Sequence, residues 1–203
     1  MTSADPTVFI VDDDLAVRDS LQLLMRSVGL ASETYGSADE FLSSYDPGRR
    51  GCLVLDVRMP GTSGLELQQR LGQFDSPLQI IFLTAHGDIE MAVQAVKAGA
   101  FDFVRKPFRD QDLLDKVQYA IAEDARRRRD AADLAGIRSR IGSLTPRERE
   151  LLEMVVQGKA NKVIAIELGI SQRTVEIHRA RVMKKMKVDS VTDLVRIAVR
   201  AGS

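Results

Sequence analysis

The sequence predicts an α/β domain with a doubly wound, five-stranded parallel sheet, followed by a long helical linker and a small all-α domain of four helices. Three observations support this fold class. Short apolar runs alternate with helical patterns about five times up to Ala122, as in a sheet with helices on both faces. The runs are almost continuously apolar, which is typical of strands buried on both sides. Beyond Ser143 the pattern is helical only.

The elements of the first domain follow from these runs and from the residues that end them. Gly29 and Gly99 end helical patterns, and Pro107 bars continuation of the last strand. We place this domain at residues 1–122. We expect strands over 7–11, 31–36, 52–56, 78–85 and 100–106, helices over 15–28, 38–44, 65–71 and 89–98, and a further helix from 110 onward.

The stretch over 123–142 is rich in alanine and charged residues and has no proline, which favours a helical linker that extends the preceding helix. It contains four consecutive arginines, Arg126 to Arg129. We interpret them as the solvated surface of a helix, with contact to DNA phosphates as the alternative.

The second domain, residues 143–203, has helix boundary signals around four short patterns. Thr145 is placed to cap the first helix, with Pro146 at its first position, and Ser171 and Ser190 are placed to cap the third and fourth. The second and third patterns are separated by a turn that contains Gly169, and the third is basic. A helix, a short turn and a basic helix form the signature of a helix-turn-helix.

Charge is distributed unevenly along the chain. The 203 residues include 29 acidic and 29 basic side chains, of which 18 acidic and 11 basic ones lie in residues 1–122. Residues 1–122 are therefore acidic overall, and the rest of the chain is basic by the same amount. These opposite net charges favour two domains with different partners, the basic one suited to nucleic acid. Cys52 is the single cysteine, which excludes an intrachain disulfide. No apolar run reaches the roughly 20 residues of a membrane span, so we expect a cytoplasmic protein with no membrane partner.

Polar side chains follow four of the predicted strands: Asp12 and Asp13, then Asp56, Thr84 and Lys106. The carboxyl ends of parallel strands share one edge of a sheet, so we expect these groups in one crevice. Converging carboxylates need a cation, and Mg²⁺ prefers carboxylate, phosphate and water oxygens. With Lys106 and Thr84 to stabilise anionic oxygens, the set predicts phosphoryl transfer to Asp56 as nucleophile. The alternative is that each is an ordinary polar loop residue.

The motifs "VDDD", "LDVRMPGTSG", "TAHGD" and "KPF", in this order, resemble the receiver domain of bacterial two-component response regulators. The resemblance implies a flavodoxin-like fold and a sensor histidine kinase that phosphorylates Asp56. It also implies that Asp13, Asp56 and the backbone carbonyl of Arg58 ligate Mg²⁺, for which Mn²⁺ can substitute, and that Asp12 acts through water.

The same resemblance implies a switch in which Thr84 moves toward the phosphoryl group and Phe103 turns inward. A static core position for Phe103 is the alternative. The Lys106–Pro107 bond resembles the cis peptide of the family. Arg58 and His86 flank the site and can influence the lifetime of the phosphoryl group, while Pro60 and Gly64 shape the loop after Asp56.

The second domain resembles the LuxR/NarL-type DNA-binding domain of FixJ-like regulators, on "LTPRERELLEMVVQGKANKVIAIELGISQRTVEIHRARVMKKM". Val175, Val182 and Met186 form an apolar face of the third helix, and the opposite face is cationic, as suits the major groove. The resemblance places Lys162, Thr174 and Arg181 at phosphates and Glu176, Ile177 and Ala180 at base edges. Arg173 and Lys184 belong to the cationic face, His178 is a packing residue, and Arg179 stays open between phosphate and solvent.

The last helix carries an apolar stripe, Val191, Leu194, Val195 and Ala198, that we interpret as a dimer contact, with the core of the domain as the alternative. Together the patterns predict a transcription regulator that dimerises when phosphorylated, binds promoter DNA, and activates transcription with RNA polymerase as a partner. A phosphorylation-independent DNA-binding regulator is the main alternative. A phosphatase or phosphotransferase is disfavoured because no second acid follows Asp56, and the basic helix disfavours an RNA-binding or purely protein-binding regulator.

Overall fold

The computed structural model describes residues 5–74, 76–84 and 89–202. The chain divides into two compact units, Met1–Arg128 and Arg129–Ser203. The boundary between them lies inside one continuous helix, α5 (Asp110–Gly142). No helix of the described ranges is long and apolar enough to cross a membrane.

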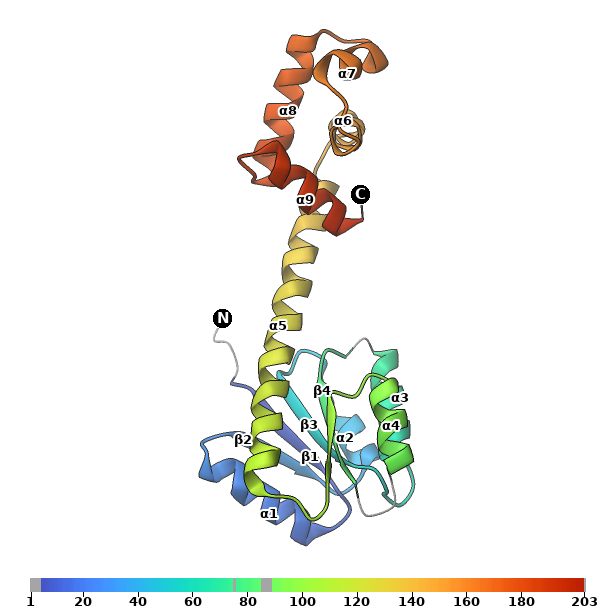
Figure 1. Ribbon diagram of the computed structural model, residues 1–203, viewed down its shortest axis with the longest axis vertical. Helices are drawn as coiled ribbons and strands as arrows, with labels where there is room; N and C mark the ends of the chain where they lie inside the picture. The colour runs from blue at the N-terminus through green and yellow to red at the C-terminus, as the bar shows by residue number, and fades with distance from the viewer. Residues whose placement is uncertain (1–4, 75, 85–88, 203) are drawn as a thin grey trace. The chain divides into compact units, whose positions relative to one another are not determined.

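The first unit contains, within the described residues, a five-stranded parallel sheet in the order β2-β1-β3-β4-β5 (Figure 1). This is the flavodoxin-like strand order, so the predicted fold class is confirmed. The predicted ends of the elements differ from the observed ones by one or two residues at most positions. The observed elements are β1 (Thr7–Val11), α1 (Leu15–Ser27), β2 (Ala31–Tyr35), α2 (Ala38–Ser44), β3 (Gly51–Asp56), α3 (Gly64–Gln73), β4 (Gln79–Thr84), α4 (Ile89–Lys97) and β5 (Asp102–Arg105).

The sheet is buried on both faces because successive side chains of each strand point to opposite sides. Phe9 and Leu53 pack under α2, α3 and α4, whereas Ile10 and Val54 pack under α1 and α5. Figure 1 shows these two layers of helices on either side of the sheet. The central strand β3 is buried from Gly51 to Leu55, which makes it a rigid mount for the residue at its end, Asp56.

The second unit is helical, with α6 (Pro146–Val156), α7 (Asn161–Leu168), α8 (Gln172–Met186) and α9 (Val191–Ala201). Thr145 and Glu148 form a capping box, and Ser171 and Ser190 cap α8 and α9 as predicted. Gly169 adopts the left-handed conformation that ends α7. The predicted apolar face of α8 packs in the core of the unit, beside residues of α6 and α7: Val175, Val182, Met186, Leu151 and Ile164.

The helix α5 is more than a spacer. Near its end Ile137 is buried in the core of the second unit, so this part of the predicted linker contributes to that core. In the arginine run, Arg126 and Arg127 pair with Glu123 one turn earlier. The hydrogen bond from Arg126, followed by that from Arg127, lowers the pKa of Glu123 to about 2. Arg128 is different, because it is mostly buried against Asp124. The interpretation of the run as solvated surface is therefore wrong for Arg128.

Candidate functional site

Two carboxylates and a lysine meet at the carboxyl edge of the sheet. Asp12 follows β1 and is only 1% exposed, and Asp56 ends the neighbouring strand β3 and is half-buried. Lys106 follows β5, and its Nζ lies 2.8 Å from Asp12 Oδ2 and 2.7 Å from Asp56 Oδ1. The structure thus brings together three of the residues that the sequence predicted would converge.

Burial and hydrogen bonding compete in the electrostatics of this cluster. Desolvation raises the pKa of Asp56, against the hydrogen bond and charge of Lys106, and the negative charge of Asp12 raises it further. Desolvation lowers the pKa of Lys106, but its hydrogen bonds to Asp12 and Asp56 outweigh burial and raise that pKa overall. The ammonium therefore stays charged between the two acids and holds them together.

The loops after β1 and β3 contain further polar groups close to this cluster. Asp13 has an exposed carboxylate that accepts no hydrogen bond from the part of the chain that the structure describes. Asp14 caps α1 by accepting a hydrogen bond from the amide of Ala16, which explains this extra acid without a ligand role. Asp56 Oδ2 accepts a hydrogen bond of 2.8 Å from the amide of Arg58.

Gly64 makes the close approach after Asp56 possible. A Cβ at Gly64 would lie 2.2 Å from the carbonyl oxygen of Asp56, so no other residue fits there without displacing the backbone. Gly64 also donates its amide to the carbonyl of Val57 at 3.1 Å, which closes the loop onto the first turn of α3. The Lys106–Pro107 peptide is cis, as predicted.

The donors fit a magnesium ion that keeps part of its water shell. Within the described ranges no three His, Cys, Asp or Glu side chains form a ready metal cage. Mg²⁺ does not need one, since it is commonly held by one or two carboxylates together with water and phosphate oxygens. Asp12 and Asp56 share Lys106, and Asp13 adds an exposed carboxylate to the loop after β1, so a divalent cation would find three acids near this edge of the sheet.

Thr84 and Phe103 lie on the same face of the sheet. Thr84 ends β4 and is buried, and in β5 its partner is Arg105, two residues beyond Phe103. Phe103 is half-buried and packs against the core under α2, α3 and α4. The structure therefore places both residues on one face of the sheet, and the switch itself stays a prediction. His86 lies outside the described residues.

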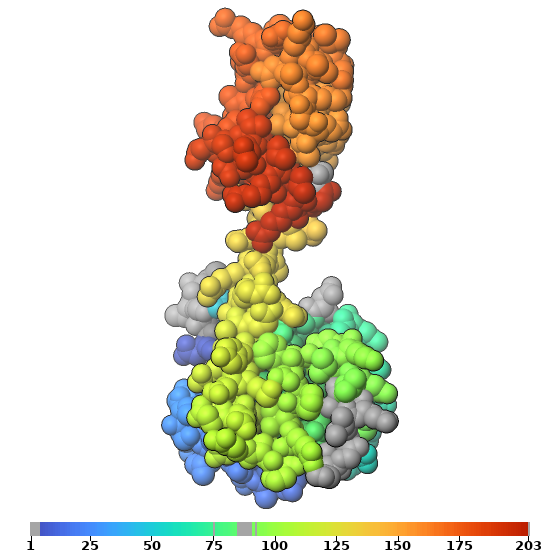
Figure 2. Space-filling view, viewed as in Figure 1, coloured from blue at the N-terminus to red at the C-terminus, as the bar shows by residue number. Residues whose placement is uncertain are grey.

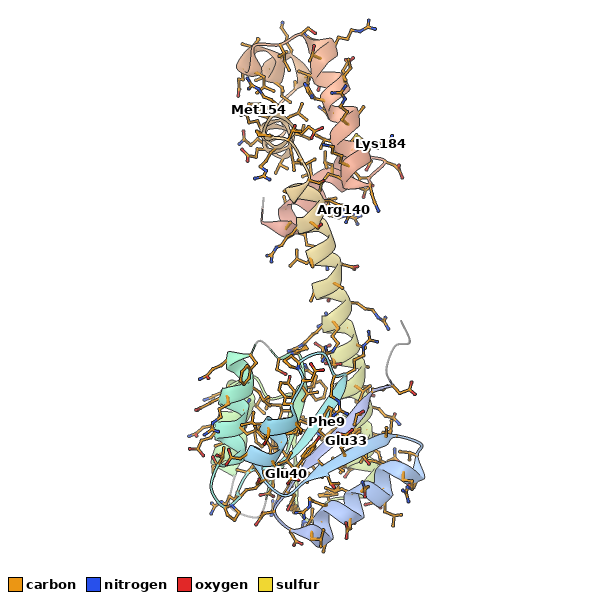
Figure 3. The ribbon with its side chains drawn as sticks, turned by 180° about the vertical axis from the view of Figure 1, so that it is seen from behind. Phe9, Glu33, Glu40, Arg140, Met154 and Lys184 are labelled. Atoms are coloured by element: carbon orange, nitrogen blue, oxygen red, sulfur yellow. The ribbon has the colours of Figure 1, made fainter. Side chains whose placement is uncertain are left out.

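The outer face of α8 is open to solvent. Arg173, Glu176, Ile177 and Ala180 line a shallow depression on this helix. Arg181 and Lys184 are exposed as well, and Figure 3 shows Lys184 on the outer side of α8. Lys162 is exposed near the start of α7, while the half-buried Thr174 shares a hydrogen bond with Ser171 at the start of α8. A cationic face thus surrounds a small apolar and acidic centre.

Other polar residues of α8 are used inside the unit. Arg179 donates to Asn161 Oδ1 at 2.6 Å, which ties α8 to the start of α7. Lys185 lies 2.7 Å from the buried carboxylate of Glu148, so it belongs to the α6 capping box rather than to the outer face. His178 has a buried Nδ1 with no hydrogen-bond partner among the described residues.

The predicted dimer stripe on α9 is divided by the structure. Leu194 and Ala198 are 1% and 0% exposed and lie in the core of the second unit, where Val195 packs beside them. These three residues hold the helix to its own unit, so the intradomain alternative applies to them. Val191 and Val199 are the large apolar side chains of α9 that are exposed, while Val195 is partly exposed.

Comparisons with known proteins agree with both units. A family model of the response regulator receiver domain matches residues 8–118, and one of the luxR family of bacterial regulatory proteins matches residues 142–198. Nodulation protein W of Bradyrhizobium diazoefficiens is 47% identical over 200 residues, which cover 98% of this chain and 88% of that protein. This chain belongs to the two-component response regulators.

Further relatives support the same family. The transcriptional regulatory protein FixJ of Azorhizobium caulinodans is 47% identical over 195 residues, covering 96% of this response regulator and 92% of that protein. The solved structure of the response regulator StyR is 45% identical, with a TM-score of 0.86 over 97% of this chain and 100% of that one. This response regulator is therefore a transcription regulator with a receiver domain and a LuxR-type DNA-binding domain.

Two polar contacts of the receiver domain were missed from the sequence. Arg18, on α1, donates to the backbone carbonyls of Asp12 and Asp13. Asp124, on α5, pairs with Arg128. The first carried a weak signal, since Arg18 lies one helical turn after the cap residue Asp14. The second has the i,i+4 spacing of a local ion pair, but its burial carried no signal, because the carbonyls of Pro47 and Arg49 that Arg128 also binds lie about 80 residues earlier in the chain.

Proposed function

We propose that Asp56 accepts a phosphoryl group from a sensor histidine kinase and that this controls transcription from promoter DNA. One observation carries the proposal: a half-buried aspartate at the end of a central strand has its oxygen 2.7 Å from a half-buried lysine. We also propose that the receiver extends over residues 1–122, the linker over 123–142 and the DNA-binding domain over 143–203.

The chemistry follows from the charges at the site. An oxygen of Asp56 attacks phosphorus, the bond from phosphorus to the kinase imidazole breaks, and an acyl phosphate forms. Lys106 is already charged and beside Asp56, so it stabilises the anionic oxygens without being reoriented. Thr84 contributes a hydroxyl from the next strand.

Residues at the ends of two neighbouring strands, β1 and β3, would hold the metal. Asp13, Asp56 and the backbone carbonyl of Arg58 would ligate Mg²⁺, or Mn²⁺ in its place, and Asp12 would act through water. When bound, the ion neutralises charge on the phosphoryl oxygens and on the carboxylates. Asp12 is fixed by Lys106 at 2.8 Å, which keeps one carboxylate in place near the ligand position.

We propose that phosphorylation is transmitted by Thr84 and Phe103 to the face formed by α4, β5 and α5. A groove of about 1330 Å³ lies along this face, between β5 and α5. In Figure 2 the surfaces of β5 and α5 lie next to one another on the side that faces the viewer. A second copy bound at this face would pair two DNA-binding domains and increase occupancy of a two-part site.

The DNA contacts we propose use the outer face of α8. Lys162, Thr174 and Arg181 contact phosphates, Glu176 accepts from a base amino group, and Ile177 contacts a thymine methyl. The remaining contacts come from residues that share this face, namely Arg173, Ala180 and Lys184. We assign Arg179 a lesser part, because it is engaged with Asn161. The regulator would then recruit RNA polymerase as an activator.

The test uses Asp56→Asn, with Asp19→Asn as a matched exposed acid on α1. We expect the wild type and Asp19→Asn to take up phosphate from a small phosphodonor with Mg²⁺, to dimerise, and to bind genomic promoter fragments more tightly. Asp56→Asn should show none of these changes and should still bind DNA weakly. Phosphate uptake is followed by intact mass, and DNA binding by gel shift with and without the donor.

The alternative of a phosphorylation-independent regulator makes a different prediction. In that case Asp56→Asn and wild type treated with phosphodonor would bind the same DNA with equal affinity, although only the latter is phosphorylated. That outcome would reject the coupling between the two domains. It would leave DNA binding itself intact, which a steep dependence of affinity on salt would demonstrate.

A further inference from the structure

We propose that Arg18 is a positioning residue that fixes the acidic loop in the conformation that binds the metal. Its guanidinium Nη1 donates to the carbonyl oxygen of Asp12 at 2.6 Å and to that of Asp13 at 3.0 Å. Arg18 is half-buried on α1; its bond to Asp12 is partly buried, and its bond to Asp13 is exposed. The inference rests on the proposed function of the site.

The contact matters most for Asp13. The Asp12 side chain is already held from two sides, by Lys106 and by the amide of Asp14 at 2.9 Å. The Asp13 carboxylate has no such contact within the described ranges. The direction of its side chain therefore depends on the backbone of the loop, which Arg18 holds by two adjacent carbonyls.

The chemistry of the contact also suits a metal site. Arg18 binds carbonyl oxygens and so leaves the Asp13 carboxylate available to a cation. Residues that orient metal ligands commonly change metal affinity by about 10- to 100-fold when replaced. Arg18 lies outside the set of proposed ligands, so its effect would come through the position of Asp13.

The Arg18 guanidinium also lies beside the turn that precedes α2. A Cβ built at Gly36 would lie 3.6 Å from Arg18 Nη1 and 3.5 Å from Glu40 Oε2. Glu40, labelled in Figure 3, accepts the amide of Gly36 at 2.7 Å and so closes this turn beside the guanidinium. The guanidinium thus lies between the acidic loop and the turn that begins α2.

Charge and position have opposite effects, which makes the inference testable. If Arg18 acted only through its charge, its removal would relieve repulsion of the cation and Mg²⁺ would bind more tightly. If Arg18 positions the loop, its removal lets Asp13 sample other directions and Mg²⁺ binds more weakly. The sign of the change therefore separates the two roles.

The experiment is calorimetric titration of MgCl₂ into the unphosphorylated full-length protein. We expect Arg18→Met to raise the Kd for Mg²⁺ about tenfold and Arg18→Lys to raise it less. Arg26→Met, an exposed arginine on the same helix, is the matched control and should bind as wild type does. Without metal, amide exchange at residues 13 and 14 should be faster in Arg18→Met than in wild type.

Equal or tighter Mg²⁺ binding by both Arg18 variants would overturn the inference alone. Absence of saturable Mg²⁺ binding by the wild type would overturn the proposed function, and this inference with it. Tyrosine fluorescence tests whether each variant is folded. If Arg18→Met is unfolded, Arg18→Lys becomes the deciding variant. Unchanged Mg²⁺ binding and unchanged amide exchange in Arg18→Lys would then overturn the inference.

Discussion

Replacement of Arg128 by methionine should sharply destabilise the receiver domain. The Arg128 guanidinium donates Nε to both carboxylate oxygens of Asp124, at 3.0 and 2.9 Å. It also donates to the backbone carbonyls of Pro47, at 3.0 Å, and Arg49. Asp124 is 1% exposed, so this single side chain neutralises a buried charge and fixes α5 to the loop before β3.

The expected size of the effect follows from what remains after the change. In Arg128→Met, Asp124 keeps the amide of Gly51, at 3.3 Å, as its partner among the described residues. Removing one member of a buried ion pair costs about 3–5 kcal/mol. Arg128 is 18% exposed, so water can partly replace it, and we expect a loss of about 3 kcal/mol in the free energy of unfolding. At an m value of about 2 kcal/mol/M, the urea midpoint falls by about 1.5 M.

Tyrosine fluorescence can measure this unfolding in the intact protein. The chain has three tyrosines and no tryptophan, and Tyr35, Tyr45 and Tyr119 all lie in the first unit. Arg127→Met is the matched control, because Arg127 pairs with Glu123 at the surface of the same helix, where an ion pair contributes little to stability. A midpoint for Arg128→Met within the small shift of Arg127→Met would refute the reasoning that the buried pair anchors α5.

Two further predictions concern the DNA-binding domain, which amide exchange of peptides from 143–203 can follow. Leu194→Ala should lower the stability of this domain by about 2–5 kcal/mol. Val199→Ala, at a side chain 59% exposed, should change it by less than about 0.5 kcal/mol. Equal effects would mean that Leu194 is a surface residue. The hydrogen bond from Lys185, followed by that from the capping-box amide of Thr145, lowers the pKa of Glu148 below its ordinary 4.5. The ionised Glu148 therefore contributes stability that is present above pH 4.5 and is lost as pH falls below that value. Glu148→Gln should flatten this acid loss, and an unchanged profile would contradict the assignment.

Much of the receiver site could be predicted because its geometry follows from strand order. Asp12, Asp56, Thr84 and Lys106 each come at a strand end, and parallel strands bring their ends to one edge whatever the details of the helices. Helix boundaries were also accessible, since caps such as Ser171 act on amides two or three residues away. Local chemistry and topology therefore carried most of the inference.

What could not be predicted depends on contacts between distant parts of the chain. A stripe of apolar residues on α9 looks the same in sequence whether it faces its own core or a second copy, and burial alone assigned Leu194 and Ala198 to the core. In the arginine run, Arg127 and Arg128 look alike in sequence, since each has an acidic residue four positions earlier. They differ because the loop over 47–51 lies against one of them.

The strand β3 lies between the proposed phosphoryl acceptor, Asp56, and a contact with α5. Asp56 ends this strand, and Gly51 begins it, with its amide on Asp124 of α5. A Cβ at Gly51 would lie 1.8 Å from the carbonyl oxygen of Thr7, so the start of the strand is held against β1 with no space to shift. Every residue between the two ends is buried. Because the strand is close-packed along its length, both of its ends are fixed in the sheet. The anchor at Asp124 and Arg128 therefore ties the strand that ends in Asp56 to the helix that continues beyond residue 128.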